Sequence, residues 1–240
     1  MAAPAAKRLL VTGGSRGIGA ACCVQAARAG WDVAVNYTRD AAAAEQVAAA
    51  VRAAGRQALV VQADVADEAQ LLAMFEQVDR GLGPLTGLVN NAGIVDRPQR
   101  VDEMDVARLR RMFDTNILGS VLCAREAVRR MSTRHGGAGG VIVNLSSAAA
   151  RLGSPAQYVD YAASKGAIDT FTLGLAREVA AEGIRVNAVR PGIIDTEIHA
   201  SGGLPDRARE LAPQVPMKRA GTADEVAAAV LWLVSDAASY

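Results

Sequence analysis

The sequence has few aromatic side chains: Phe, Trp and Tyr make up 4% of its 240 residues, whereas hydrophobic residues together make up 51%. A core therefore has to be built mainly from Ala, Val, Leu and Ile. Alanine-rich helices packed on valine-rich buried strands are typical of a parallel sheet covered on both faces. A chain of this length can bury a large core, and one α/β domain of this size is common.

Other features are scarce or absent, and each absence excludes a class of protein. The sequence has no run of about 18 apolar residues, so we expect no membrane span. Met1 to Arg8 contains no apolar core of a signal peptide. Net charge is +1 and no long basic run occurs, so nucleic acid is not an expected partner. Cys22, Cys23 and Cys123 show no metal-ligand spacing, which predicts no metal site and favours a reducing cytoplasm.

Apolar runs and amphipathic stretches alternate along the chain. This alternation predicts right-handed crossovers and a single parallel sheet, with no linker that would divide the chain into domains. The expected strands lie near 7–12, 32–37, 58–62, 87–90, 140–145 and 184–189. The expected helices lie near 18–29, 41–54, 68–80, 103–131, 160–182 and 223–234.

The run Tyr158-Val-Asp-Tyr-Ala-Ala-Ser-Lys165 carries the strongest chemical signal. Residues four apart on a helix share a face, so Tyr161 and Lys165 should lie side by side. A phenol titrates about three pH units above neutral, and a neighbouring ammonium favours the phenolate. We therefore expect the pKa of Tyr161 to fall, which suits acid–base catalysis. Taken alone, the pair could also be two solvated residues on a helix surface.

A glycine-rich turn, Thr12-Gly-Gly-Ser-Arg-Gly-Ile-Gly19, follows the apolar run at 9–11 and precedes an amphipathic stretch. Strand, glycine turn and helix in this order present backbone N–H groups to a phosphate at a helix N-terminus. The spacing differs from the common G-x-G-x-x-G fingerprint. The glycines nevertheless suit a tight turn, a close backbone approach and close packing of helix on sheet. A turn without a ligand is the alternative.

Two further apolar strands end in polar residues. Leu88-Val-Asn-Asn-Ala-Gly93 runs into two asparagines, and Val141-Ile-Val-Asn-Leu-Ser-Ser147 ends in two hydroxyls. Ligands bind beyond the carboxyl ends of parallel strands in open α/β sheets, so these side chains are expected at a binding site. For the asparagines, an ordinary Asx turn is the alternative.

Together these motifs resemble the short-chain dehydrogenase/reductase family over nearly the whole chain, and Asn116 and the run Pro191-Gly192 followed by Thr196 add to the resemblance. The resemblance implies a Rossmann-type doubly wound parallel sheet, with residues 1–240 forming one dinucleotide-binding catalytic domain. It also implies a variable substrate loop at about 193–220.

The resemblance implies a catalytic role for four residues. Tyr161 would be the acid/base, Lys165 would lower its pKa and hold the nicotinamide ribose, Ser147 would bind the substrate oxygen, and Asn116 would hold a water in a proton relay. Ser147 and Tyr161 are fourteen residues apart, one more than in many relatives. Ser146 is therefore a weaker contender for the serine role.

The family usually continues after its last helix into a strand with a Thr-Gly…Asp-Gly-Gly pattern. The sequence here ends at Ser239-Tyr240. The resemblance therefore leaves the edge of the sheet and one usual oligomer contact open.

The expected cofactor is NADP(H), with NAD(H) as the alternative. NAD enzymes usually place an acid after the second strand to bind the ribose diol, whereas Tyr37 occupies this place here. Arg16 and Arg39 could flank a 2′-phosphate through their forked donors, or could simply be solvated. Asp64 and Val65 should flank the adenine. The full expected cofactor set is Gly13, Ser15, Arg16, Gly17, Ile18, Gly19, Tyr37, Arg39, Asp64, Val65, Asn91, Ala92, Gly93, Tyr161, Lys165, Pro191, Gly192, Ile194 and Thr196.

The expected substrate is a small carbonyl or alcohol: a polar carbonyl, a polyol or a 3-oxoacyl thioester. Residues 149–154 should form one wall of its pocket and residues 192–204 a lid, with Arg151 and His199 as polar candidates. The scarcity of bulky aromatics near these segments argues against large flat substrates such as steroids.

Two rival functions remain open at this point. One is an epimerase or dehydratase that uses bound nicotinamide, which the short chain disfavours. The other is an NADP-binding regulatory protein without turnover, whose expected mark is the loss of a catalytic residue. The helices at 103–131 and 160–182 carry more apolar residues than one sheet-facing stripe needs, including Phe171 and Leu175. This surplus predicts that both helices are buried on more than one side, with a purely sheet-facing core as the alternative. The resemblance implies that the two helices form a dimer interface, in a homodimer or a homotetramer.

Overall fold

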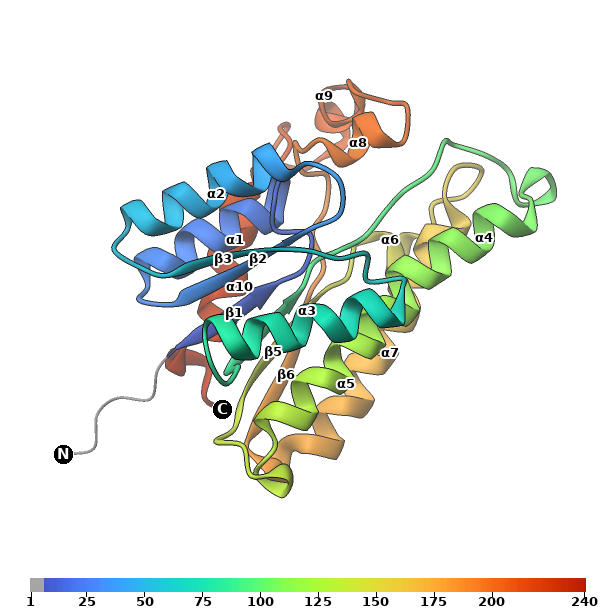
Figure 1. Ribbon diagram of the computed structural model, residues 1–240. Coiled ribbons are helices and arrows are strands. Elements are labelled where there is room, and N and C mark those ends of the chain that lie inside the picture. Colours follow the sequence, from blue (N-terminus) through green and yellow to red (C-terminus); the bar gives the residue numbers. More distant parts are fainter. Residues whose placement is uncertain (1–6) are drawn as a thin grey trace.

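The computed structural model describes residues 7–240, and residues 1–6 of the expected 1–240 domain lie outside the described residues. Six strands form one parallel sheet in the order β3-β2-β1-β4-β5-β6 (Figure 1). The strands are β1 (Arg8–Val11), β2 (Asp32–Tyr37), β3 (Ala58–Gln62), β4 (Gly87–Asn90), β5 (Gly140–Leu145) and β6 (Ile184–Val189). The Rossmann-type doubly wound fold expected from the sequence is thus confirmed.

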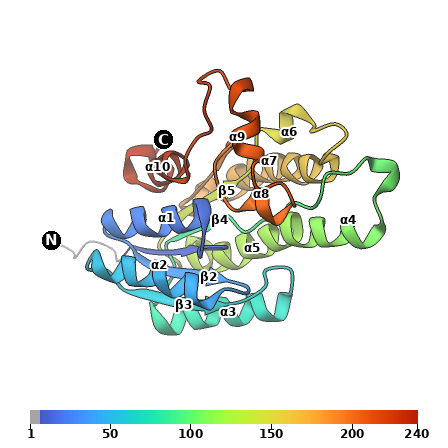
Figure 2. The same cartoon turned by 90° about the horizontal axis from the view of Figure 1, so that it is seen from above.

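The two faces of the sheet bury two separate cores. Side chains alternate along a strand, so Leu9 and Val11 enter one core while Leu10 enters the other. The first core lies under α1 (Gly17–Arg28), α2 (Ala41–Ala53) and α10 (Ala223–Val234). The second lies under α3 (Glu68–Gly81), α5 (Ser120–Met131) and α7 (Val159–Val179). Figure 2 shows the two helical layers on opposite sides of the strands.

The predicted continuous helix at 103–131 is wrong. The chain forms a 3-10 turn at Val101–Glu103, α4 at Val106–Phe113, a π-helical turn at Asp114–Gly119 and then α5. Asp105 starts α4, since its carboxylate accepts the backbone N–H of Arg108 at 2.7 Å. The wide π turn directs the Asn116 side chain away from the helix toward the loop after β4. Such turns are frequent at functional sites.

The segment expected as the substrate loop contains two short helices, α8 (Ile198–Ser201) and α9 (Arg207–Leu211). They lie above the sheet in Figure 1, next to the glycine turn and the loop after β4. Another short helix, α6 (Ala149–Leu152), lies between β5 and α7.

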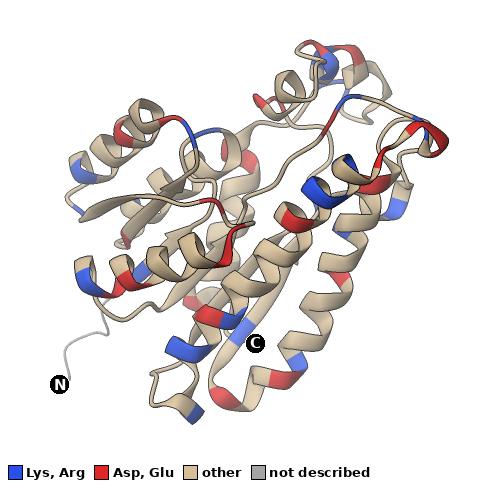
Figure 3. Ribbon diagram, turned by 45° about the vertical axis from the view of Figure 1, so that its right-hand side comes forward, with Lys and Arg blue, Asp and Glu red and all other residues tan. Residues whose placement is uncertain are grey.

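Figure 3 shows Lys and Arg mixed with Asp and Glu over the visible helices. Among residues 7–240, no helix is long and apolar enough to cross a membrane.

Candidate active site

The glycine turn after β1 is held tightly against the end of β4. The Thr12 hydroxyl accepts the backbone N–H groups of Asn91 and Ala92, each at 3.0 Å. The Asn91 amide donates to the carbonyls of Thr12 at 2.9 Å and Gly13 at 3.0 Å. A Cβ on Gly19 would lie 2.3 Å from the Gly13 carbonyl oxygen and 2.5 Å from Asn91 Nδ2. Only glycine fits here, because the first of these atoms is backbone of the turn and the second is fixed to the turn by hydrogen bonds.

This turn leads into the N-terminus of α1. Gly13 and Gly17 have φ values of +61° and +53°, which glycine adopts without steric cost. Arg16 stands at the N-cap and makes no side-chain cap. The first N–H groups of α1 therefore remain available to an anionic ligand, as in other helix N-termini that bind phosphate.

Asn36 is a residue that the sequence analysis missed. It is buried at the end of β2, and its side-chain oxygen accepts the backbone N–H of Gly13 at 3.1 Å. Its amide donates to the carbonyl of Ala63 at 3.0 Å. Asn36 thus fixes the glycine turn to the chain after β3. The available signal was a polar residue at the carboxyl end of an otherwise apolar strand.

The four predicted catalytic residues come together at the carboxyl ends of β4 and β5. The Ser147 hydroxyl, just beyond β5, makes a hydrogen bond to the Tyr161 side chain on α7. Lys165 Nζ lies 5.7 Å from the centre of the Tyr161 ring and donates to the Leu145 carbonyl at 2.6 Å. A Cβ on Gly93 would lie 3.4 Å from Asn116 Oδ1 and 3.5 Å from Lys165 Nζ. The loop after β4 therefore lies against both of these side chains.

The structure separates the two candidate serines. The Ser146 hydroxyl is buried and donates to the Lys165 backbone carbonyl at 3.2 Å. Ser147 is half-buried and faces Tyr161. Of the two, only Ser147 is placed beside the phenol.

Asn116 connects the π turn to the rest of the site. Its side-chain oxygen accepts the Ile94 N–H at 2.8 Å, and its amide donates to the Ile94 carbonyl at 3.0 Å and to Ser164 Oγ at 3.2 Å. This double hydrogen bond to one residue fixes the backbone of the loop after β4.

The pKa of Tyr161 shifts in the direction opposite to the sequence-based expectation. Burial raises the pKa of Tyr161, and the hydrogen bond from Ser147 opposes this rise without cancelling it. Burial also lowers the pKa of Lys165 to about 8, against the opposing charge of Asp169. The expected fall in the Tyr161 pKa is therefore wrong for the protein without ligand. The reason is that desolvation of the buried phenol is the largest influence on its pKa, and only the hydrogen bond from Ser147 opposes it.

The directions of these pKa shifts determine which group can give a proton. A phenol with a raised pKa is protonated at neutral pH, so Tyr161 begins as a proton donor. Ser147 donates or accepts beside it. The pair is therefore suited to stabilising and protonating an oxygen that acquires negative charge.

The residues expected at the adenosine end lie around the ends of β2 and β3. Tyr37 is half-buried, whereas Arg39 and Arg16 are exposed. Arg16 donates to Ser201 Oγ of α8 at 3.3 Å. The Asp64 carboxylate accepts the Ala66 N–H at 3.0 Å, and buried Val65 packs closely on Gly119 of the π turn.

The predicted lid contacts the glycine turn. Thr196 lies against Gly17, and a cavity of about 500 Å³ there is lined by Gly17, Asp195, Thr196, Glu197, Ala200, Pro205 and Ala223. Of the other residues expected at this end, Ser15, Ile18, Pro191 and Ile194 are half-buried and Gly192 is exposed.

The polar candidates for substrate contact differ in their surroundings. His199 Nε2 makes a hydrogen bond with the Ile194 carbonyl at 2.9 Å, and burial lowers the pKa of its ring. Arg207 of α9 stacks over the Tyr158 ring at 4.9 Å. Arg151 on α6 is exposed. His199 is thus held by the backbone of its own segment and Arg207 by the Tyr158 ring, while the Arg151 side chain has no such partner in what the structure describes of residues 7–240. No cluster of potential metal ligands occurs within the same range.

Comparison with known proteins agrees with this geometry. A family model for the short chain dehydrogenases matches residues 7–204. An uncharacterized oxidoreductase of Escherichia coli, YgfF, is 55% identical over 231 residues, covering 96% of this chain and 94% of that protein. The 3-oxoacyl-[acyl-carrier-protein] reductase FabG of Staphylococcus aureus is 38% identical over 235 residues, covering 98% and 93%. A short chain dehydrogenase of Burkholderia cenocepacia, solved in complex with NADP, superposes with a TM-score of 0.86 at 36% identity, covering 95% and 90%.

The chain therefore belongs to the short-chain dehydrogenase/reductase family. It is an oxidoreductase of this family, whose members use a nicotinamide cofactor.

Proposed function

We propose that this protein is an NADP(H)-dependent oxidoreductase that interconverts a small carbonyl and the corresponding alcohol. One observation carries the proposal: Tyr161, Ser147 and Lys165 meet at the carboxyl ends of β4 and β5, next to the glycine turn. Proton donor, oxygen-binding hydroxyl and buried ammonium are the groups that reduction of a carbonyl requires from the protein.

The residues fit a dinucleotide. The absence of a Cβ at Gly19 would let the backbone approach the diphosphate closely. The N-terminus of α1 would supply N–H donors for the diphosphate. Gly93 would leave room beside Asn116 and Lys165 for the nicotinamide ribose. The bound nicotinamide would supply or accept hydride. The protein's own residues do the rest: Ser147 and Tyr161 hold the substrate oxygen, and Tyr161 gives it a proton.

Two further residues support Tyr161 in this scheme. The Lys165 ammonium would stabilise the phenolate left after proton transfer, since the charge of Lys165 then faces an anion instead of a neutral phenol. Asn116 would hold a water that returns a proton to the site. Both roles fit groups that the structure places beside Gly93.

The preference for NADP(H) rests on the end of β2. Tyr37 stands where an acid would bind the ribose diol, and the exposed guanidinium groups of Arg16 and Arg39 can approach a 2′-phosphate. The Burkholderia relative was solved with NADP. NAD(H) remains the alternative cofactor.

The substrate that we favour is a small polar carbonyl, a polyol or a 3-oxoacyl thioester. The name of the Staphylococcus relative points to the last of these. Residues 149–154 and 192–204 would enclose it, with Arg151 and His199 as its polar contacts. We propose that the whole chain acts as one catalytic domain. Three buried free thiols, Cys22, Cys23 and Cys123, suit a cytoplasmic location.

The proposal also includes assembly of copies of this chain through α5, α7 and the π turn that precedes α5. Leu173 on α7 is 62% exposed and Leu118 on the π turn is 46% exposed. Pairing these surfaces in a homodimer, or in a homotetramer, would bury both side chains.

The test is a reductase assay with NADPH or NADH and a panel of small ketones, dicarbonyls, aldoses and 3-oxoacyl thioesters. We expect turnover with a higher kcat/KM for NADPH. Equal kcat/KM for the two cofactors would contradict the NADP preference. Tight NADPH binding without turnover on any compound would favour a regulatory protein.

A further inference from the structure

Arg108 forms a buried ion pair outside the proposed catalytic set. Its side chain in α4 is 5% exposed, and that of Asp160 in α7 is fully buried. Arg108 Nε donates to Asp160 Oδ2 at 2.8 Å and Nη2 donates to Oδ1 at 3.2 Å. Two parallel hydrogen bonds of this kind fix the relative orientation of both groups as well as their distance.

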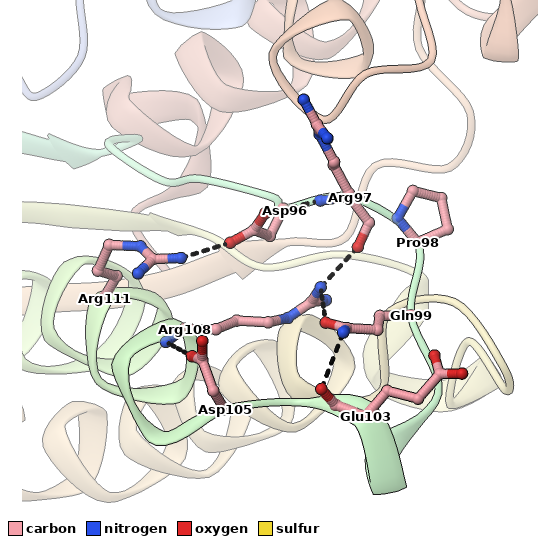
Figure 4. A pocket seen from close by; sticks show the side chains of 8 residues that line it. All are labelled: Asp96, Arg97, Pro98, Gln99, Glu103, Asp105, Arg108 and Arg111. Atoms are coloured by element: carbon pink, nitrogen blue, oxygen red, sulfur yellow. Dashed lines mark hydrogen bonds and ion pairs between the residues drawn. The ribbon is translucent and has the colours of Figure 1, made fainter.

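The remaining nitrogen of Arg108 binds the loop after β4. Nη1 donates to the Arg97 carbonyl at 2.6 Å and to Gln99 Oε1 at 3.0 Å. Figure 4 shows the Arg108 guanidinium directed at these two residues, while its backbone N–H is held by Asp105. One guanidinium therefore joins α4, α7 and this loop.

Asp160 immediately precedes Tyr161 in the first turn of α7. Its Oδ1 also accepts the backbone N–H of Tyr161 at 2.9 Å. The carboxylate that binds Arg108 is therefore the same group that holds the backbone of the proposed proton donor. A shift of Asp160 would move the backbone of Tyr161 and, with it, the Tyr161 side chain.

Asn116 and Arg108 both hold the loop after β4, and Arg111 binds it as well through Asp96. Asn116 binds both backbone groups of Ile94, and Arg108 binds the loop at Arg97 and Gln99. Gly93, which lies against Lys165 Nζ, directly precedes this stretch. The ion pair thus connects the backbone of Tyr161 to the wall of the proposed nicotinamide pocket.

We infer that Arg108 and Asp160 are positioning residues for the reaction, and that their ion pair sets the phenol of Tyr161 relative to the loop at 93–99. The inference rests on the proposed function. Stability alone does not require a buried ion pair, because neutral residues of similar size often stabilise a core equally well or better. Directional hydrogen bonds to both a helix and a loop are what a pair of apolar residues cannot supply.

The test compares Arg108→Met, Arg108→Lys, Asp160→Asn and the double variant Arg108→Met/Asp160→Asn with the wild type. Arg111→Met is the matched control: Arg111 lies one turn further along α4, lines the same pocket as Arg108 (Figure 4) and pairs with Asp96 at the surface. The measurements are thermal unfolding, kcat, KM, the Kd for NADPH, and the isotope effect on kcat with NADPH deuterated at C4.

Arg108→Met leaves a buried carboxylate without its partner and should lower stability. The double variant removes both charges and should recover that stability. We expect kcat of the double variant to stay about 10–100-fold below wild type, as for other small misplacements of reacting groups. Its isotope effect should rise because hydride transfer becomes rate-limiting, while its Kd for NADPH stays close to wild type. Arg108→Lys should be slow as well, because an ammonium cannot make the bidentate contact.

Two results would overturn the inference. If kcat and the isotope effect return to wild-type values in the double variant, the pair is only structural. If Arg111→Met lowers kcat as much as the double variant, the effect belongs to the α4 surface in general. A wild-type protein that turns over no carbonyl compound would instead contradict the proposed function, and the inference with it.

Discussion

Replacing Lys165 by Met should make the protein more stable at neutral pH. Lys165 is 5% exposed, and burial lowers its pKa from 10.5 to about 8. That change corresponds to about 3 kcal/mol against the charged ammonium in the folded protein. Methionine removes this penalty. It also leaves the Leu145 carbonyl without the donor now at 2.6 Å, which costs about 1 kcal/mol. The net expected gain is about 2 kcal/mol at pH 7.

The sign and the pH range of this effect follow from proton linkage. Below pH 8 the lysine is charged in both the folded and the unfolded chain, so the full penalty destabilises the wild type. Between pH 8 and 10.5 the unfolded chain binds more protons than the folded one, so wild-type stability rises with pH. The advantage of Lys165→Met should therefore shrink over this range. Above pH 10.5, only the loss of the hydrogen bond to Leu145 remains, so Lys165→Met should be less stable than the wild type.

Urea unfolding at pH 7 and at pH 10, at one fixed protein concentration, measures both differences. Lys218→Met is the control, because Lys218 is exposed and donates only to the Pro213 carbonyl. Its stability should follow that of the wild type at both pH values. A Lys165→Met variant that is less stable than wild type at pH 7, or whose gain is the same at pH 10, would refute the reasoning.

Two other changes have defined expected outcomes. Gly19→Ala should abolish measurable NADPH binding and cost about 1–3 kcal/mol of stability through overpacking, because its Cβ would lie 2.3 Å from the Gly13 carbonyl oxygen. Gly166→Ala, where a Cβ meets nothing within 4 Å, should instead raise the free energy of unfolding by about 0.5–1 kcal/mol. Calorimetry measures NADPH binding, and unfolding measures the stability of both variants. Equal NADPH binding and equal stability of the two variants would contradict a close approach of cofactor and backbone at Gly19. Leu173→Glu should convert an oligomer into a smaller species, as measured by light scattering, because it puts a charge in the middle of the proposed α7 contact. A wild-type protein that is monomeric at micromolar concentration would contradict that contact.

Local pattern predicted most of the fold. The strands at 32–37, 58–62 and 184–189 are found with the expected bounds, because each is an apolar run between turns. The last helix, expected at 223–234, begins at a capping box: Thr222 Oγ1 accepts the Glu225 N–H at 3.2 Å, and the Glu225 carboxylate accepts the Thr222 N–H at 2.8 Å. Signals of this kind depend only on residues a few positions apart.

The candidate site was predicted less completely, because parts of it depend on contacts between distant residues. Arg108 and Asp160 are 52 positions apart, and nothing in the helical periodicity of either segment marks them as partners. The π turn at Asn116 is stabilised by hydrogen bonds to Ile94 and Ser164, which periodicity does not show. The direction of the Tyr161 pKa was missed for a related reason, since the burial of a side chain at the end of a sheet is set by the whole fold.

The central claim is that Tyr161 supplies the proton in a nicotinamide-dependent reduction. The most direct measurement compares Tyr161→Phe with wild type in the reductase assay, together with the Kd for NADPH of both proteins. The account predicts that Tyr161→Phe binds NADPH like the wild type and loses about 10²–10⁴-fold in kcat. A Tyr161→Phe variant that retains near wild-type kcat would contradict it.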